Sequence, residues 1–319
     1  MPGAMAPRAS APAARYESAA TKPSAFEAQA ARAKWLMLAP LLVVLLLVAG
    51  WPLIRTISES FTDAYLSSPD SKFVGLDNYV ALMQDPRWRR AVLNTLAFAL
   101  ISVALETILG VAIALVLNAN MPGRGLTRAA MLIPWAIPTV VSAKMWAWML
   151  NDLNGVVNMM LMKIGLIAQP IAWLADPWLA MASVIAVDVW KATPFMALLA
   201  LAALQTIPDE VYESAKLDGA GAWTIFTRIT LPLIAAALTI AVIFRALDAL
   251  RIFDVIYVLT GTTRATSTMS IYARQQLVEF QDVGFGSAAA TCVFLIIAII
   301  VAIVVTVRRV DVEPLRSAS

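Results

Sequence analysis

The sequence predicts an all-α integral membrane protein with six transmembrane helices, on the strength of its composition and its long apolar runs. The 319 residues have a mean hydropathy of +0.77 and only 14% are charged, whereas soluble domains carry about 25%. The run from Trp35 to Ile54 contains no charged residue. It is long enough to cross the ~30 Å hydrocarbon core as a helix of roughly 20 residues. Spans must be helical, because open strands would leave backbone polar groups unpaired in lipid.

The predicted spans follow one another along the chain. They cover residues 35–54, 91–117, 129–150, 177–204, 232–260 and 284–307. Residues 1–34 are rich in Ala, Pro and Ser, which predicts a largely disordered tail without a cleaved leader. Within that tail, Ser24–Glu27 fits a capping box that would start a short helix before the first span. Residues 308–319 form a second tail.

The distribution of basic residues predicts that both termini are cytoplasmic. With the termini inside, inner segments hold 12 Lys and Arg and outer segments hold 8, in the direction of the positive-inside rule. The chain has no histidine and a single cysteine, Cys292, which argues against zinc chemistry and excludes a disulfide within the chain. No basic patch interleaved with aromatic residues indicates a nucleic-acid partner.

The loop at 205–231 would be cytoplasmic, and its residues predict a helix, a turn and a second short helix. Thr206 can cap the first turn, Pro208 suits a helix start, and Asp209 and Glu210 favour the positive end of the helix dipole. Gly219 offers a left-handed stop. The second helix would run from about residue 221 to 232. The expected apolar contacts of the loop are Val211, Tyr212, Ala215 and Leu217.

The charge of this loop is mainly acidic, and this bears on what it contacts. An amphipathic connector on the bilayer surface would favour Lys and Arg, but in the first predicted helix of the loop Lys216 is the only base against four acids. These acids are Asp209, Glu210, Glu213 and Asp218. The composition therefore favours docking to a basic protein partner over simple contact with the membrane surface.

The same loop resembles the E-A-A-x3-G-x9-I-x-L-P loop of bacterial ATP-binding-cassette (ABC) importer permeases. The matching residues are Glu213, Ser214, Ala215, Gly219, Ile229, Leu231 and Pro232, with serine in place of the first alanine. Four further stretches resemble the carbohydrate branch related to the maltose and glycerol-phosphate permeases: 73–79, 132–138, 254–260 and 282–286. The resemblance covers roughly residues 35–307 and implies the six-helix type I importer permease fold.

In that family the loop is the coupling helix, which sits in a cleft of a cytoplasmic ATPase. The resemblance implies that Glu213 makes the charge contact, Ala215 packs closely, Gly219 forms the turn and Pro232 enters the fifth span. Ser214, Asp218, Ile229 and Leu231 complete the predicted coupling set. No G-x4-G-K-[ST] motif occurs in the chain, so ATP and Mg²⁺ are expected on a separate ATPase and no cofactor is expected in this chain. The implied assembly has a second homologous permease, two ATPase copies and an extracytoplasmic solute-binding protein.

Charged residues inside the spans form a second candidate site. Arg245, Asp248, Arg251 and Asp254 recur every three residues in the fifth span, and each would cost about 2.5–3.5 kcal/mol at the bilayer centre. They must therefore face protein, one another or water. One interpretation is an intrahelical ladder of opposite charges. The other is a hydrated cavity in which guanidinium and carboxylate groups hold a hydroxyl-rich solute.

The fourth span adds a possible sugar contact, because Asp188 and Lys191 flank Trp190. An indole face beside charged groups suits a sugar ring, and in maltose-type permeases the matching spans hold the sugar. The predicted solute-binding residues are Asp188, Trp190, Thr193, Arg245, Asp248 and Arg251. Glu106 and Lys144, alone in the second and third spans, are expected to pair with another span or, for Lys144, to reach an interface.

The predicted function is a permease subunit of an ATP-driven importer for a carbohydrate, such as an α-glucoside or trehalose, with no covalent chemistry of its own. Glycerol phosphate or another polar solute is an alternative within the family. An ion-coupled secondary transporter or channel is the alternative outside it, but it would not explain an acidic docking loop, and no paired halves with broken helices are evident. An intramembrane enzyme has little support, because no metal cluster or G-x-S-x-G motif is present.

Overall fold

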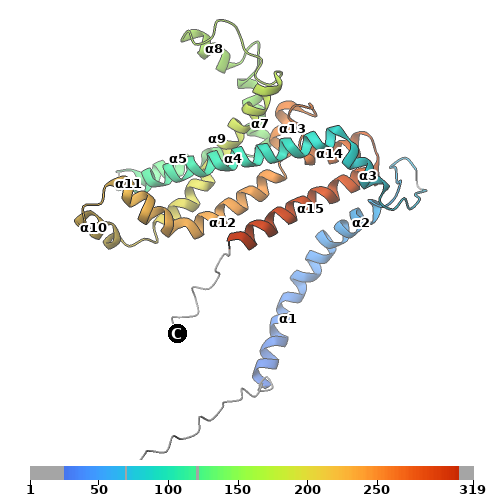
Figure 1. The fold of residues 1–319 in the computed structure, drawn as a ribbon, viewed down its shortest axis with the longest axis horizontal. Coiled ribbons are helices and arrows are strands. Elements are labelled where there is room, and N and C mark those ends of the chain that lie inside the picture. The colour runs from blue at the N-terminus through green and yellow to red at the C-terminus, as the bar shows by residue number, and fades with distance from the viewer. Residues whose placement is uncertain (1–24, 69, 120–121, 309–319) are drawn as a thin grey trace, which may run out of the picture. The chain divides into compact units, whose positions relative to one another are not determined.

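The computed structural model describes residues 25–68, 70–119 and 122–308, and no β-strand occurs in these ranges. The chain divides into two compact units, residues 1–54 and residues 55–319. The first unit carries α1, and the second carries the helices from α3 to α15 (Figure 1).

The described part of the first unit, residues 25–54, forms one long apolar helix. It comprises α1 (Ala25–Leu45), a π-turn (Leu46–Gly50) and the start of α2 (Trp51–Glu59). The Trp51 N–H donates to the carbonyl of Leu46, and the π-turn lies directly before Pro52. Proline has no N–H to donate, and a π-turn is a usual way to accommodate such a gap in an α-helix. The predicted capping residue Ser24 and most of the predicted tail lie outside the described residues.

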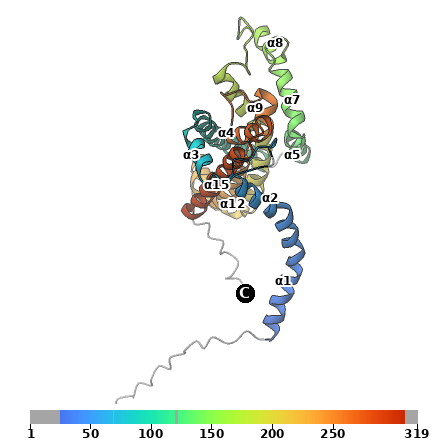
Figure 2. The same cartoon turned by 90° about the vertical axis from the view of Figure 1, so that its right-hand side faces the viewer.

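The larger unit is built from α-helices and two π-turns in its described part. Its elements after α2 are α3 (Asp77–Gln84), α4 (Pro86–Asn118), α5 (Arg124–Met131), α6 (Ile133–Ala136), α7 (Thr139–Met149), α8 (Val156–Lys163), α9 (Pro177–Leu204), α10 (Asp209–Leu217), α11 (Ala222–Ile225), a π-turn (Phe226–Thr230), α12 (Leu231–Leu250), α13 (Asp254–Thr260), α14 (Met269–Arg274), a π-turn (Gln275–Glu279) and α15 (Val283–Arg308). Figure 1 shows α10 at one end of this unit and α3 at the other, and in both Figure 1 and Figure 2 α8 projects beyond the other helices of the unit.

Five helices of the described chain are long and apolar enough to cross a membrane, and a bent pair gives a sixth span. The five are 33–59, 86–118, 177–204, 222–250 and 283–304, and the bent pair joins 124–136 to 139–149 at 87°. The six predicted spans are thus present in the order expected.

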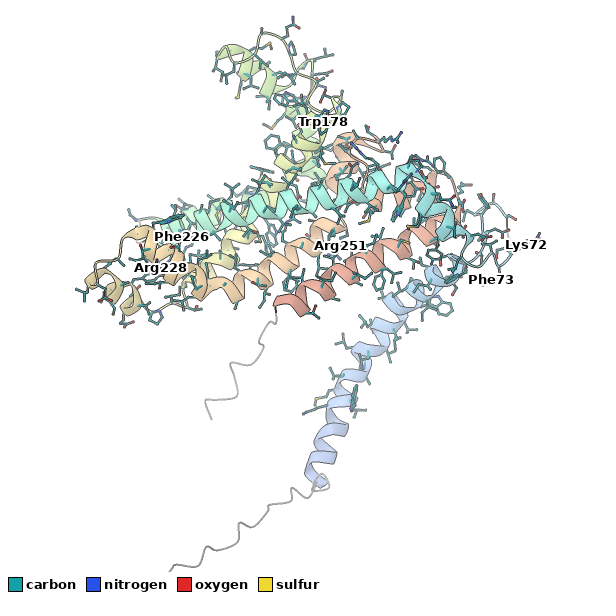
Figure 3. All side chains as sticks on the ribbon, in the orientation of Figure 1. Lys72, Phe73, Trp178, Phe226, Arg228 and Arg251 are labelled. Carbon is teal, nitrogen blue, oxygen red and sulfur yellow. The ribbon has the colours of Figure 1, made fainter. Side chains whose placement is uncertain are left out.

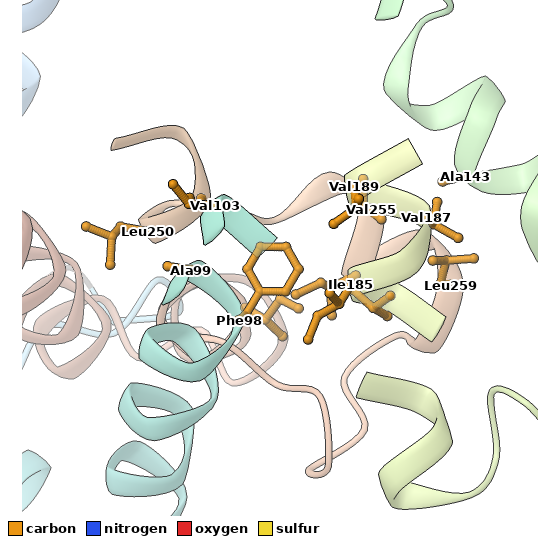
Figure 4. Packing of buried hydrophobic residues seen from close by; sticks show 14 of the residues in the cluster. Phe98, Ala99, Val103, Ala143, Ile185, Val187, Val189, Leu250, Val255 and Leu259 are labelled. Carbon is orange, nitrogen blue, oxygen red and sulfur yellow. The ribbon is translucent and has the colours of Figure 1, made fainter. Parts of the chain in front are cut away.

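The core lies where α4 and α9 pack along their length. Gly110 allows this approach, because a Cβ there would stand 2.8 Å from the Met196 Cβ and 3.0 Å from the Ala197 nitrogen. Buried Phe98 of α4 belongs to the main apolar cluster together with Ile185 of α9 and Val255 of α13 (Figure 4). This packing fixes three spans relative to one another and so positions the polar groups they carry.

The third span is not the continuous helix predicted for 129–150. It breaks at Ile137 and Pro138, and the two helical parts meet at 87°. Ile137 is extended at φ −69°, ψ 132°, as expected for a residue that precedes proline. Because Pro138 cannot donate a backbone hydrogen bond, the helix has both a steric and a hydrogen-bonding reason to end there.

The fifth span also differs from the prediction for 232–260. It begins earlier, at Ala222, runs through a π-turn placed just before Pro232, and ends at Leu250. Residues 251–253 then separate it from α13. The Ile252 carbonyl in this break accepts a hydrogen bond from the Thr268 hydroxyl at 3.1 Å. Two spans are therefore broken, although no broken helices were evident in the sequence.

The end of the bundle that carries α3 is fastened by polar contacts outside the spans. Asp85 caps α4 by accepting from the Arg87 N–H at 2.7 Å, and the Tyr272 hydroxyl donates to the same carboxylate at 2.6 Å. Partial burial opposes ionisation of Asp85, but the hydrogen bonds from Tyr272 and Arg87 outweigh it and lower the pKa of Asp85. Asn94 of α4 donates its amide to the carbonyls of Ala265 and Ser267 and so holds the loop before α14.

Candidate functional site

A large cavity lies where the two broken spans face α9 and α15. Its volume is about 1400 Å³, and its wall includes Pro138 and Thr139 at the first break and Ile252 and Phe253 at the second. Nonpolar side chains such as Phe195 and Phe294 make up much of the lining. Its charged lining residues are Asp188, Lys191, Arg245, Asp248, Arg251 and Asp254.

A buried cluster of three charges ties three spans together at one side of this cavity. Arg245 of α12 donates from Nε to Glu106 of α4 at 2.5 Å and from Nη2 to the other Glu106 oxygen at 2.9 Å. The same Nη2 donates to Asp188 of α9. All three side chains are at most 6% exposed. Burying such charges is tolerable only when they are paired and hydrogen-bonded, as they are here.

A second pair of charges lies close by, at the end of α12, and lines the same cavity. Arg251 Nη2 donates to Asp248 at 3.0 Å, and both side chains are more than 60% exposed. Arg251 is labelled in Figure 3. Arg245 lies 3.7 Å from Asp248 and connects the two groups of charges. The predicted ladder of four residues is therefore wrong at Asp254, because α12 ends before it and no ion pair of Asp254 occurs in the described structure.

Two predicted solute-binding residues lie away from the cavity wall. Trp190 packs edge-on to Trp146, with ring centroids 5.5 Å apart, and lines a separate groove between α4 and α9. Thr193 is buried, and its hydroxyl has no hydrogen-bond partner among the described residues. The structure therefore brings together Asp188, Arg245, Asp248 and Arg251 but not Trp190 and Thr193, because successive positions on α9 face different neighbours.

Lys191 is a cavity residue that was not among the predicted solute contacts. Its ammonium group donates to the carbonyl of Ile137 at 2.6 Å and to that of Trp135 at 3.4 Å. Both of these residues also line the cavity. An ionisable residue in a span is itself a signal of function, and the i, i+3 spacing from Asp188 could have included it. The pairing of Glu106 with another span is confirmed. Lys144 is exposed and has no partner in the described part of the chain.

The predicted coupling loop has the helix–turn–helix form expected of it. α10 covers Asp209–Leu217 and α11 begins at Ala222. Gly219 has a φ of +78°, its N–H donates to the Lys216 carbonyl, and the Ala220 N–H donates to the Ala215 carbonyl. This is the Schellman pattern that ends a helix with a left-handed glycine. The stop predicted at Gly219 is confirmed.

The side chains of α10 divide between one buried contact and an exposed face. Ala215 is buried, whereas Glu213, Ser214, Asp218 and Gly219 are exposed. Leu217, one of the expected apolar contacts of the loop, is 89% exposed and makes no such contact within the described chain.

The links between this loop and the spans are partly those predicted. Thr206 does not cap α10, because Pro208 precedes the first turn and the Thr206 hydroxyl donates to the Ala203 carbonyl. The Tyr212 and Thr230 hydroxyls lie 3.5 Å apart and join α10 to the π-turn before α12. Ile229 is half-buried in that turn, and Leu231 and Pro232 begin α12.

Comparison with known proteins places the chain in a transport family. Residues 106–310 match the family described as binding-protein-dependent transport system inner membrane component. The trehalose/maltose transport system permease protein MalF of Thermococcus litoralis is 42% identical, over 84% of this chain and 90% of that protein. The trehalose transport system permease protein SugA of Mycobacterium tuberculosis is 37% identical, over 84% of this chain and 86% of its own.

Solved structures support the same fold. A bacterial ABC transporter involved in importing the acidic polysaccharide alginate superposes on 89% of this chain and 98% of its own, with a TM-score of 0.78 and 26% identity. A second structure, in complex with an alginate pentasaccharide-bound periplasmic protein, covers 91% and 99% with a TM-score of 0.79 and 25% identity. The chain therefore belongs to the inner membrane components of binding-protein-dependent transport systems and is a multi-pass ABC importer permease.

Proposed function

We propose that this permease imports an α-glucoside such as trehalose. The names of the relatives support this, because two of them are trehalose or trehalose/maltose permeases that match more than four fifths of the chain. The proposed assembly contains a second homologous permease, two copies of a cytoplasmic ATPase and an extracytoplasmic solute-binding protein. A periplasmic protein is bound in one of the similar transporters.

The observation that carries the proposal is the chemistry of the cavity. Trp135 and Phe195 line it as a stacked pair with centroids 5.8 Å apart, while Asp248 and Arg251 are exposed in the same space. Sugar rings present apolar C–H faces to aromatic rings and hydroxyls to charged donors and acceptors. A volume of about 1400 Å³ is ample for such a solute, since typical ligand pockets measure about 300–1,000 Å³.

The proposed coupling runs through α10. The helix is joined to α9 and α12, which carry Asp188 and Arg245 of the buried cluster. Nucleotide-driven closure of two ATPase subunits would draw the coupling helices together and change the access of the cavity. ATP and Mg²⁺ would be bound by the ATPase alone, and both termini of this chain would face the cytoplasm.

Transport by the complete assembly in proteoliposomes tests the function. With ATP inside and the loaded binding protein outside, labelled trehalose should accumulate, and the accumulation should stop without ATP or with a non-hydrolysable nucleotide. Uptake that persists without ATP but collapses with an ion gradient would identify a secondary transporter instead.

A phosphorylated solute is the second candidate, because Lys191 and Arg251 both line the cavity. Adding glycerol phosphate or maltose in excess to the trehalose assay, with the matching binding protein, separates the two. Competition by maltose alone is the result expected for an α-glucoside importer.

The coupling role of α10 has its own test. Glu213→Lys should leave the permease inserted but reduce ATP-dependent uptake, because the contact with a basic ATPase residue would become repulsive. Glu210→Lys is the matched control, since Glu210 is also exposed on α10. Undiminished uptake by Glu213→Lys, or equal loss in both variants, would contradict a specific role for Glu213.

A further inference from the structure

The break in the third span leaves backbone carbonyls without helical partners at the cavity wall. α6 ends at Ala136 and α7 begins at Thr139, so the carbonyls of Trp135 and Ile137 face a gap in the helical hydrogen-bond pattern. Irregular backbone inside a membrane is tolerated only where it is buried in protein or lines a cavity and its polar groups find partners. Lys191 of α9 supplies the partner for both carbonyls.

The ammonium group of Lys191 is not neutralised by a carboxylate. No oxygen of an acidic side chain lies within salt-bridge distance of it in the described residues, and the carboxylate one turn away, Asp188, is bound by Arg245. An ammonium group has three N–H donors, and the two hydrogen bonds found here use carbonyl oxygens. Lys191 also lines the cavity. A charged donor is therefore available on the solute side of the break.

We propose that Lys191 is a solute-binding and positioning residue, which fixes the bend between α6 and α7 and offers its remaining N–H to an oxygen of the solute. This inference rests on the proposed function, because it takes the cavity to be the solute site. It adds a contact from α9 to those proposed for Asp248 and Arg251, which line the same cavity. A hydroxyl or another oxygen of the solute accepts the third hydrogen bond of the ammonium group. When the solute leaves, the two hydrogen bonds from Lys191 to the carbonyls of Trp135 and Ile137 remain and still hold the bend.

The positioning role is tested without any solute. Spin labels at Leu126→Cys in α5 and Trp148→Cys in α7, both exposed positions, report the distance across the break on a Cys292→Ala background. Lys191→Met should shift or broaden this distance distribution, and Lys191→Arg should restore it. Lys144→Met is the matched control, because Lys144 is an exposed lysine of α7 without a partner in the described structure. A Lys191→Met distribution equal to that of the unsubstituted lysine overturns the proposal.

The solute contact is tested by trehalose uptake in the full assembly. Lys191→Met should raise the KM for uptake about tenfold or more, as loss of a hydrogen bond from a charged group does, with a smaller change in the maximal rate. Lys191→Arg should retain most of the affinity, and Lys144→Met should transport normally. An unchanged KM in Lys191→Met overturns the proposal. If Lys191→Met does not insert, Lys191→Leu, which likewise has no N–H donor in its side chain, is judged by the same criteria.

The two experiments separate this inference from the proposed function. Failure of the unsubstituted permease to take up any sugar removes the proposed function, and the solute contact falls with it. The distance between the spin labels at positions 126 and 148 still tests whether Lys191 fixes the bend between α6 and α7. Normal sugar uptake with no effect of Lys191→Met leaves the proposed function standing and rejects the inference alone.

Discussion

Two arginines near the end of the fifth span, Arg245 within α12 and Arg251 directly after it, show how neighbouring charges acquire different roles. Arg245 is 4% exposed and binds carboxylates from α4 and α9, whereas Arg251 is 69% exposed and binds Asp248, three residues before it. Removing one partner of a buried ion pair leaves an uncompensated charge in a low dielectric. An exposed pair keeps its access to water and contributes little to stability. The first group therefore serves to join three spans, and the second is free to meet a solute.

The largest effect is expected for Arg245→Leu. This change leaves Glu106 and Asp188 buried without their cation and should lower the free energy of unfolding by about 3–5 kcal/mol. The measurement is the thermal unfolding midpoint of the purified permease in detergent. Arg251→Leu, the same substitution at the exposed arginine directly after α12, is the control.

The expected change for the control is within about 1 kcal/mol. Equal destabilisation by both variants would contradict the distinction between buried and exposed arginines. A variant in which Arg245, Glu106 and Asp188 are all replaced by apolar residues should recover much of the lost stability, because no buried charge remains unpaired.

A smaller effect is expected for Glu106→Gln. The side-chain amide oxygen still accepts a hydrogen bond from Arg245, and the substitution removes one of two carboxylates that share one guanidinium. Losing the charge-assisted character of these bonds should cost about 1–2 kcal/mol. The measurement is the thermal unfolding midpoint of Glu106→Gln compared with that of Glu106→Leu, which retains no hydrogen-bond acceptor. A Glu106→Gln loss as large as that of Arg245→Leu would show that Glu106 carries the whole cluster.

For the exposed pair, transport should respond more than stability. Asp248→Asn and Arg251→Gln should each change the free energy of unfolding by less than about 1 kcal/mol, while the KM for trehalose uptake rises about tenfold through lost charged hydrogen bonds. A double-substitution cycle on unfolding midpoints measures their coupling. If either variant loses as much free energy of unfolding as Arg245→Leu while its KM stays normal, this pair stabilises the fold and does not contact the solute.

The smallest effect concerns the Asp85–Tyr272 hydrogen bond outside the spans. The pKa of Asp85 is lowered in the folded protein, so the stability it contributes is fully present above the unfolded value of about 3.9 and is lost as pH falls through the lower, folded value. Between pH 7 and pH 5 we expect no contribution from Asp85 to the slope of stability with pH. In Asp85→Asn, the free energy of unfolding should therefore fall less steeply as the pH is lowered below about 4.

The measurement for Asp85 is the difference in unfolding midpoint between the two forms as a function of pH. A difference that grows between pH 5 and pH 7 would contradict the assignment. The Tyr272 hydroxyl donates to the Asp85 carboxylate and helps to lower the pKa of Asp85. Tyr272→Phe should therefore reduce the loss of stability that Asp85 causes at low pH.

The helix–turn–helix form of the loop at 205–231 could be predicted from the sequence because it depends on contacts close in the chain. Gly219, Pro208 and the acids of the first turn each act on residues within one turn of themselves, so reading them in order predicts the helix and its end. Leu217 was the exception among the packing residues. Its exposure depends on what lies across from α10, which local sequence does not contain.

The broken spans and the charge partners could not be predicted in the same way. Ile137 and Pro138 indicate a weak point in a helix, but prolines also occur inside unbroken helices of this chain, as Pro194 does in α9. Whether a break persists depends on a donor from another span, here Lys191. Likewise, the regular spacing of charges in α12 predicted pairing along one helix, whereas Arg245 found its strongest partners on α4 and α9.

The sequence by itself determined the membrane class, the order of the spans, the coupling loop and the need to shield the charges of α12, since hydropathy and turn chemistry are properties of local composition. Only the tertiary structure decided which charges are buried together and which face the cavity. The physical reason is that a charge in a membrane protein is stabilised by whatever group lies within about 3–4 Å of it. Helix packing brings together groups, such as Glu106 and Arg245, that are far apart in the chain.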